Sequence, residues 1–257
     1  MGSMRKVHGK VRKCGVFCAG ALVALALYPA PARAGMFAFM TPTGAMTGGG
    51  PVNAEADLTT TAGSIMVTLR NLQANPTDVA QLLSDFRFTV DAGGSLTGSS
   101  QTGASSQELT VSGNGTFNIG ANLTTVAAVG WVYSSAATDG ALDVLTGPGH
   151  AGPAHLIIGP PGGGGTYSAA NGSIAGNGPH NPFLNQSASF TLTAPNVSSD
   201  TPITGVTFSF GITAGVEIPG VPVAAVPEPG SIVLLATATG TLAGYFGWRR
   251  RKQIQAS

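Results

Sequence analysis

Three histidines and two aspartates are the residues in this sequence best suited to bind a metal ion. The histidines are His150, His155 and His180, and the aspartates are Asp139 and Asp143. A zinc site needs three or four ligands that converge, but neither an HExxH motif nor a cysteine pair accompanies these residues. The segment from Asp139 to Asp143 offers calcium two carboxylates, fewer than a calcium-binding loop supplies. We therefore predict no metal site and no cofactor.

Hydrolytic chemistry is also not expected. A nucleophilic serine needs a nearby base and oxyanion donors, and no Gly-x-Ser-x-Gly elbow occurs among the many serines. Glycoside hydrolysis needs two carboxyl groups that flank the scissile bond, whereas the few acidic residues here lie mostly in predicted turns. We therefore predict no catalytic residues and a protein that is not an enzyme.

Sugar binding is the alternative that the aromatic residues favour most. Trp131 and Tyr133 are two residues apart in a predicted strand, so they would share one face of it. Tyr167 lies in a predicted loop beside Asn171, and an exposed ring of this kind can stack against a sugar. Trp131 is also surrounded by valines, as expected for a core residue. A lectin-like surface and a buried tryptophan therefore both remain open.

These residues would be positioned by short strands. Between residues 35 and 218, β-branched and aromatic residues alternate with Thr and Ser, and clusters of Gly, Asn, Ser and Pro interrupt them. About 190 residues are enough for one domain with its own core. The pattern predicts an all-β fold, an antiparallel β-sandwich with one short helix. The best predicted strands are Ile65–Leu69, Phe86–Val90, Leu123–Tyr133, His155–Ile158, Phe190–Thr193 and Val206–Phe210.

The one helix is predicted after Asn75. This residue can cap a helix, Pro76 suits the first turn, and apolar residues recur at helical spacing from Val79 to Phe86. An extended connection between two strands is the alternative.

The charge of the exported part differs from that of the whole chain. The formal net charge of the chain is +1. Between Gly35 and Ala225 there are two arginines, ten carboxylates and no lysine, which gives −8. Nucleic-acid binding requires a clustered basic face, so it is excluded. The same charge repels anionic polysaccharide unless divalent cations bridge the two.

The N-terminus has the features of a signal peptide that the Sec translocon exports. Basic residues from Arg5 to Lys13 precede an apolar stretch at 14–28, and Pro29 follows it. Ala32 and Ala34 are the small residues that signal peptidase requires, so we predict cleavage after Ala34. Both cysteines of the chain lie in the removed segment, so no disulfide would hold the mature protein.

The C-terminus has the features of a membrane anchor. Residues 231–248 contain no charged side chain, and as a helix they span roughly 27 Å, close to the thickness of a bilayer core of about 30 Å. The basic cluster at 249–252 should stay in the cytoplasm and leave the upstream chain outside. Pro227, Glu228 and Pro229 directly precede the apolar span.

Together, this Pro-Glu-Pro element, the apolar span and the cluster of Arg249, Arg250 and Arg251 closely resemble the PEP-CTERM sorting signal of bacterial surface proteins. The resemblance implies that a membrane-embedded exosortase reads the tail, cleaves near Pro-Glu-Pro, and releases the protein or transfers it to the cell surface. It also implies a Gram-negative bacterium that makes exopolysaccharide. An ordinary anchor behind a Pro-rich linker is the alternative.

The predicted organisation follows from these segments. The expected function is that of an exported, non-enzymatic structural or adhesive component of the cell surface, the exopolysaccharide or the biofilm matrix, with a carbohydrate-binding surface module as the alternative. The folded ectodomain would be flanked by an N-terminal signal helix and a C-terminal transmembrane helix. The segments are a signal peptide at 1–34, a β-rich ectodomain at 35–218, a Pro-containing linker at 219–226, the sorting signal at 227–252 and a cytoplasmic tail at 253–257.

Overall fold

The computed structural model describes residues 34–168, 173–213 and 216–223. All of them belong to the second of two units of the chain, Ala34–Ser257. The predicted signal helix and the predicted transmembrane helix lie outside the described residues. Within the described residues, no helix has the length and apolar character needed to cross a membrane.

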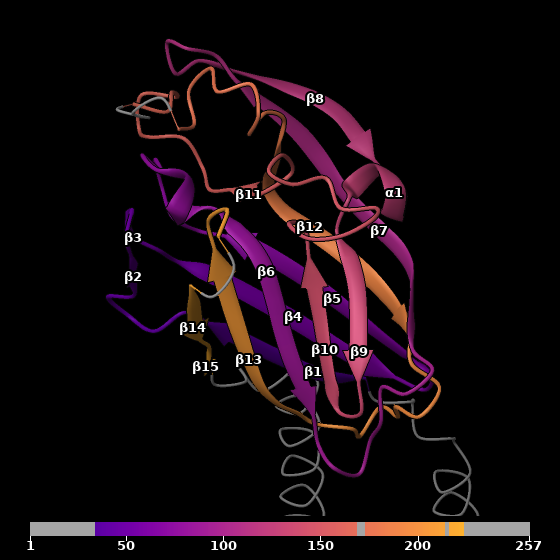
Figure 1. The fold of residues 1–257 in the computed structure, drawn as a ribbon. Helices are drawn as coiled ribbons and strands as arrows, with labels where there is room; N and C mark the ends of the chain where they lie inside the picture. Colours follow the sequence, from indigo (N-terminus) through magenta and orange to yellow (C-terminus); the bar gives the residue numbers. More distant parts are fainter. Residues whose placement is uncertain (1–33, 169–172, 214–215, 224–257) are drawn as a thin grey trace, which may run out of the picture. The chain divides into compact units, whose positions relative to one another are not determined.

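Five strands form a first face of the fold (Figure 1). Neighbouring strands on this face are all antiparallel. In spatial order they are β9 (Val132–Ala136), β10 (Asp139–Asp143), β6 (Leu83–Val90), β13 (Ile203–Phe210) and β14 (Glu217–Pro219).

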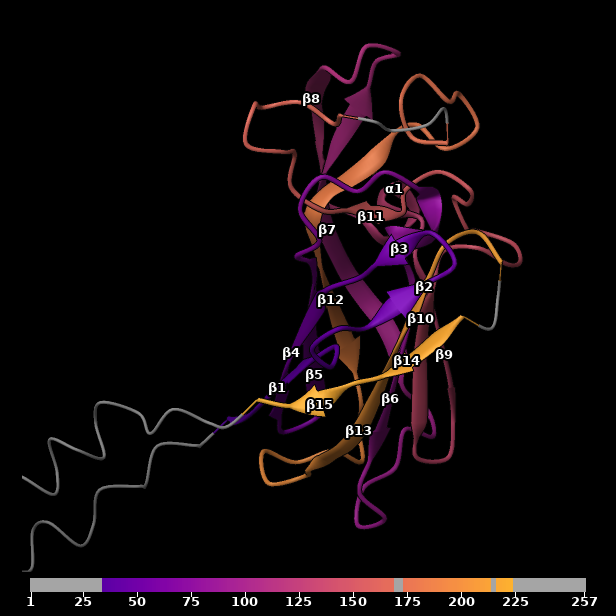
Figure 2. The same cartoon turned by 90° about the vertical axis from the view of Figure 1, so that its left-hand side faces the viewer.

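Seven strands form a second face behind the first (Figure 2). The pairs between neighbours are again antiparallel. In spatial order they are β8 (Phe117–Leu123), β7 (Ser100–Val111), β12 (Phe183–Thr193), β5 (Ser64–Asn71), β4 (Ala54–Thr61), β1 (Gly35–Met40) and β15 (Val221–Pro222).

The two faces are joined into one sheet of 13 strands. The link is β11 (Ile157–Ile158), which pairs antiparallel with β6 and parallel with β12. A separate hairpin consists of β2 (Met46–Thr47) and β3 (Gly50–Pro51). The predicted all-β class is therefore confirmed. The structure differs from two separate antiparallel sheets because hydrogen-bonded pairing continues from one face to the other through β11.

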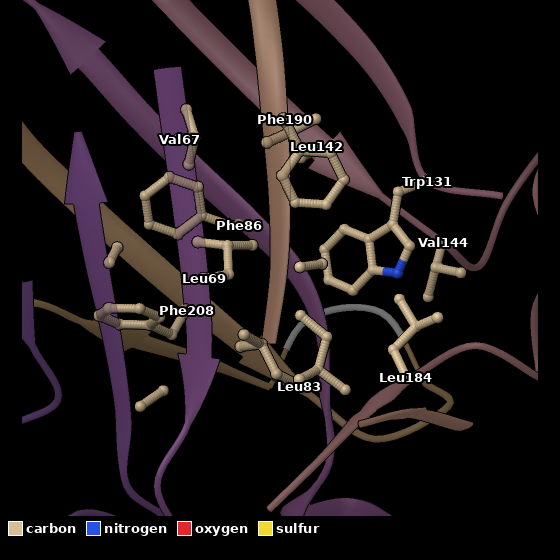
Figure 3. Packing of buried hydrophobic residues seen from close by; sticks show 14 of the residues in the cluster. Val67, Leu69, Leu83, Phe86, Trp131, Leu142, Val144, Leu184, Phe190 and Phe208 are labelled. Carbon is tan, nitrogen blue, oxygen red and sulfur yellow. The ribbon is translucent and has the colours of Figure 1, made fainter. Parts of the chain in front are cut away.

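The core lies between the two faces, as the alternation of apolar residues requires. Along β5, Ile65, Val67 and Leu69 are fully buried, and the residues between them are not. Figure 3 shows side chains from both faces meeting in one cluster. Phe86 and Phe208 have ring centroids 5.5 Å apart. The predicted strands around Ile65, Phe86, Phe190 and Val206 are confirmed as β5, β6, β12 and β13.

The predicted strand from Leu123 to Tyr133 is wrong. Leu123 ends β8, a short helix α1 (Val126–Val129) follows, and β9 begins at Val132. The Thr125 hydroxyl caps this helix by accepting a hydrogen bond from the Ala128 amide at 3.2 Å. Gly130 ends the helix with a left-handed φ of 71°. Local capping therefore overrides the β propensity of the valines.

The predicted helix after Asn75 is also wrong. A single 3₁₀ turn, η2 (Val79–Gln81), forms instead, and Asp78 rather than Asn75 caps it. The Gln81 side chain completes a capping box by accepting hydrogen bonds from the Thr77 and Asp78 amides. Leu82 is already extended, and the chain then enters β6. The apolar residues serve the core face of a strand, so their spacing does not propagate a helix.

Part of the linker predicted at 219–226 lies within the described residues, and there the prediction is wrong. Pro219 ends β14, and β15 (Val221–Pro222) pairs with Phe39 and Met40 of β1. Proline is tolerated in these positions because both strands are short and lie at the edges of the sheet. Residues 219–222 therefore belong to the folded part, and 224–226 lie outside the described residues.

The burial of Trp131 gives a first prediction. Its side chain is 0% exposed and its ring lies 5.6 Å from that of Phe190. We expect Trp131→Ala to lower the free energy of unfolding by about 3–5 kcal/mol because it leaves a cavity in the core. Urea unfolding followed by far-UV circular dichroism measures this. Met66→Ala, at a side chain that is 52% exposed, is the control and should change little. Equal effects of the two variants would contradict a core role for Trp131.

Candidate functional site

A polar trough lies on the outer surface of the first face. It has a volume of about 590 Å³ and is lined by β6, β9, β10, β13 and β14. These strands lie in the foreground of Figure 1. The lining side chains that carry polar groups are Arg87, Thr89, Ser134, Ser135, Asp139, Thr207 and Glu217.

The strand register explains why the surface is hollow here. Ser134 lies opposite Ala141, Ala141 opposite Arg87, and Arg87 opposite Thr207. Because outward residues on neighbouring strands form rows across a sheet, one long side chain stands between short ones. The small neighbours leave open space on both sides of Arg87, and this space is the trough.

Arg87 is the cation of the trough. Its Nη1 lies 3.1 Å from Oε1 of Glu217, and its Nε lies 3.4 Å from Oδ2 of Asp85. The side chain is 57% exposed, so these surface pairs add little to stability. At the other end of the trough, the Thr89 hydroxyl donates to Oδ1 of Asp139 at 2.7 Å. The site thus presents hydroxyl, carboxylate and guanidinium groups to solvent.

Asp85 is a partly buried carboxylate beside the trough. Burial raises the pKa of Asp85, and the nearby charge of Asp143 raises it further, while Arg87 and the hydrogen bond from Ser209 oppose the rise. Ser209 donates to Oδ2 at 3.3 Å, and Oδ1 is buried without a hydrogen-bond partner. The ionised form is therefore disfavoured in the folded protein relative to the unfolded chain.

Asp139 and Asp143 occupy opposite ends of β10. Four residues along a strand correspond to about 13 Å, so the two carboxylates cannot chelate one ion. Asp143 instead accepts hydrogen bonds from the Leu145 and Thr146 amides in the turn that follows.

The three histidines have separate partners. His150 Nε2 lies 3.7 Å from Asp143, His155 Nε2 lies 3.4 Å from Glu108, and His180 Nδ1 contacts the Ser173 carbonyl. No group of three or more His, Cys, Asp or Glu side chains within the described ranges is arranged to hold a metal ion.

The three aromatic residues considered for sugar stacking do not form a platform. Trp131 is 0% exposed and donates from Nε1 to the His155 carbonyl at 2.9 Å. Tyr167 is 1% exposed and donates to the Gly159 carbonyl at 2.9 Å. Tyr133 is half-buried, stacks on Phe88, and contacts the Ser99 hydroxyl. Burial leaves the rings of Trp131 and Tyr167 without a free face for a sugar.

Among the trough residues, only Asp139 stands out in the sequence alone, as a candidate calcium ligand. Polar residues at alternate positions of β6 and β13 give a period-two pattern in the sequence, and β10 has an aspartate at each end. That pattern shows which side chains face outward, but it does not show which strands are neighbours. The row from Ser134 to Thr207 depends on pairing between segments far apart in the chain.

Of the residues predicted to direct sorting, Ala34 is described and is exposed directly before β1. The others lie outside the described residues: Ala32, Pro227, Glu228, Pro229, Arg249, Arg250 and Arg251. Residues 225–252 match the PEP-CTERM protein-sorting motif, which confirms the resemblance of the tail. The chain matches no curated protein and no solved structure. The motif marks an exported protein that an exosortase processes, and the family of the ectodomain is unidentified.

The raised pKa of Asp85 predicts how stability depends on pH. The unfolded chain loses this proton near the ordinary aspartate pKa of about 3.9, whereas the folded protein loses it at higher pH. The stability that protonated Asp85 contributes is therefore fully present at pH values below the pKa of the unfolded chain. It is lost as the pH rises through the higher pKa of the folded protein. We expect the stability of the natural protein relative to Asp85→Asn to fall as the pH rises from below the unfolded pKa of about 3.9 through the higher pKa of the folded protein.

Denaturant unfolding of both proteins across this pH range is the measurement. The matched control is Asp200→Asn, at an exposed aspartate away from the trough. A difference between natural protein and Asp85→Asn that stays constant with pH, or that shifts in the opposite direction, would show that burial does not control this carboxyl group.

Proposed function

We propose that this chain is a surface-sorted, non-enzymatic protein that serves as a structural or adhesive component of the cell surface or the exopolysaccharide matrix. The observation that carries the proposal is the PEP-CTERM protein-sorting motif at residues 225–252. This motif implies an exosortase as the processing partner. The export route, the final location of the protein and the role of its folded part are the points that we propose.

The proposed route uses both ends of the chain. The Sec translocon exports the protein, and signal peptidase cleaves after Ala34. The apolar span at 231–248 then holds the protein in the inner membrane, with the basic cluster in the cytoplasm and the folded part in the periplasm. Cleavage near Pro-Glu-Pro transfers the folded part to the cell surface or releases it.

The physical character of the folded part supports a structural role. Its net charge of −8 favours solubility and discourages binding to nucleic acid. Its stability does not depend on disulfides, because residues 35–223 contain no cysteine. The carboxylates of Asp85 and Glu217 are paired with Arg87, and those of Glu55 and Asp57 with Arg70. These groups are held in ion pairs within the sheet surface.

A second candidate function is the binding of a neutral polysaccharide in the trough. The observation that favours it is an open hollow of about 590 Å³ whose walls carry an arginine, carboxylates and hydroxyls. Such groups form hydrogen bonds with sugar hydroxyls, and a guanidinium has five donors in a fixed geometry. The acidic surroundings favour an uncharged glycan over an anionic one.

The sorting proposal predicts the outcome of changing the tail. Glu228→Gln and Pro229→Ala should each leave a longer form that is retained in the membrane, because the processing enzyme no longer reads the element. Fractionation of cells and medium, followed by immunoblotting, measures both the length and the location of the protein. Val221→Ala, at an exposed residue outside the motif, is the control and should be processed normally. If both tail variants are released like the natural protein, the tail is a membrane anchor but not a sorting signal.

The trough predicts a difference between the two arginines of the exported part. Arg87→Gln should weaken binding to neutral glycans on an array because it removes the central donor. Arg70→Gln is the matched control, since Arg70 is also paired with two carboxylates but lies on β5 of the other face. A glycan signal that both variants lose equally, or that neither loses, would rule out binding in the trough.

A further inference from the structure

The bond that signal peptidase is predicted to cut lies directly at the start of the folded part. Ala34 is exposed, and β1 begins with the next residue, Gly35. Every residue of β1 has a partner on β4, and Gly35 lies opposite Thr60. The first residue after the scissile bond is therefore already part of the sheet.

The packing around Gly35 leaves no room beside this residue. A Cβ at this position would lie 2.5 Å from Oγ1 of Thr60 and 2.6 Å from the carbonyl oxygen of Ser199. The Thr60 hydroxyl donates to the same carbonyl at 3.3 Å. Strand β4 and the connection between β12 and β13 thus enclose the start of β1. Access of a protease depends on the burial and hydrogen bonding of the backbone that it must bind, and here that backbone is engaged.

The rest of β1 is held by the core and by a second neighbour. Phe39 is 3% exposed and belongs to the core cluster, and Phe37 packs against this cluster. On its other edge, β1 pairs with β15 at Phe39 and Met40 (Figure 2). Moving the start of β1 into a protease would therefore begin to peel a core strand from the sheet. Strands of this kind open rarely in native proteins.

The cleavage element of the tail has a different relation to the fold. The last described contact of the chain with β1 is the Val223 amide, which donates to the Ala38 carbonyl at 2.8 Å. Pro227 begins the Pro-Glu-Pro element four residues further along the chain. Four residues reach up to about 14 Å. The tail element therefore lies beyond the backbone pairs of the described residues, whereas the bond after Ala34 directly adjoins them.

We infer that the fold orders the two cleavages of this chain: the bond between Ala34 and Gly35 is hydrolysed before β1 joins β4, whereas the tail remains open to cleavage after folding is complete. In the first step, water adds across the peptide bond. Ala34 becomes the carboxylate end of the released signal peptide, and Gly35 keeps the nitrogen as the new amino terminus. This inference rests on the proposed export route and adds its order of events.

Delayed addition of signal peptidase tests the first half of the inference. Cells depleted of the enzyme accumulate the full-length precursor, which is solubilised in detergent and then given purified signal peptidase. The matched variant carries about eight extra glycine and serine residues between Ala34 and Gly35, which form a flexible spacer. The spacer keeps the residues before the bond and moves the bond away from β1. Resistance of the folded part to thermolysin shows that both precursors are folded.

We expect the spacer variant to be cleaved roughly tenfold faster than the natural precursor, because cleavage of the natural chain waits for β1 to open. In cells that contain signal peptidase throughout, both chains should be cleaved equally, since the enzyme then acts before folding. Equal rates for the two folded precursors would overturn the order while leaving the export route intact. If neither chain is cleaved in undepleted cells, the site after Ala34 is wrong, and the order is overturned together with the route.

Delayed expression of the exosortase tests the second half. Its gene is repressed while a labelled pulse of the natural chain loses its signal peptide and folds, and the gene is then induced. We expect the labelled chain to be shortened at its tail as completely as chain made in the presence of the enzyme. If only newly made chain is shortened, the second half of the inference is wrong. If neither is shortened, the proposed sorting itself fails, which the Glu228→Gln variant shows as its reference pattern.

Discussion

The fold of the described residues depends on one apolar core held between two faces of a single sheet. No cysteine is present after residue 34 to cross-link these faces, so burial must supply the stability. Phe86, Phe208 and Phe190 contribute large side chains to this cluster. Trp131 completes it from the connection between α1 and β9, where its indole nitrogen also satisfies a backbone carbonyl.

The burial of apolar side chains between the two faces also determines which side chains lie on the outer surfaces. Because the inward positions of β6 and β13 are occupied by phenylalanine and valine, their outward positions carry the polar groups. Arg87 stands among small side chains there, and the acidic residues gather beside it. Asp85 is the exception, since one of its oxygens is buried without a partner. The fold therefore places a carboxyl group with a raised pKa next to the trough.

The sequence predicted those parts of the fold that depend on local pattern. The predicted parts of β6, β12 and β13 alternate large apolar with polar residues, and β5 does so apart from Met66. The segment from Val126 to Val129 has the composition of a strand, yet the Thr125 cap and the left-handed Gly130 make it a helix. The C-terminal tail was predictable because its three elements are contiguous. The trough was not, because its residues come together only through the pairing of distant strands.

The edges of the sheet differ in whether the chain closes them with another strand. At one margin, the chain passes from β14 on the first face to β15 on the second through Gly220. A side chain at Gly220 would collide with Val206 and Phe208, so glycine permits this close crossing. At the ends of the two faces, β11 bonds to both β6 and β12 and continues the sheet. The edge of β8 has no such closure among the described residues. A core completed within one chain thus leaves one edge of an uncharged strand without a partner strand among the described residues.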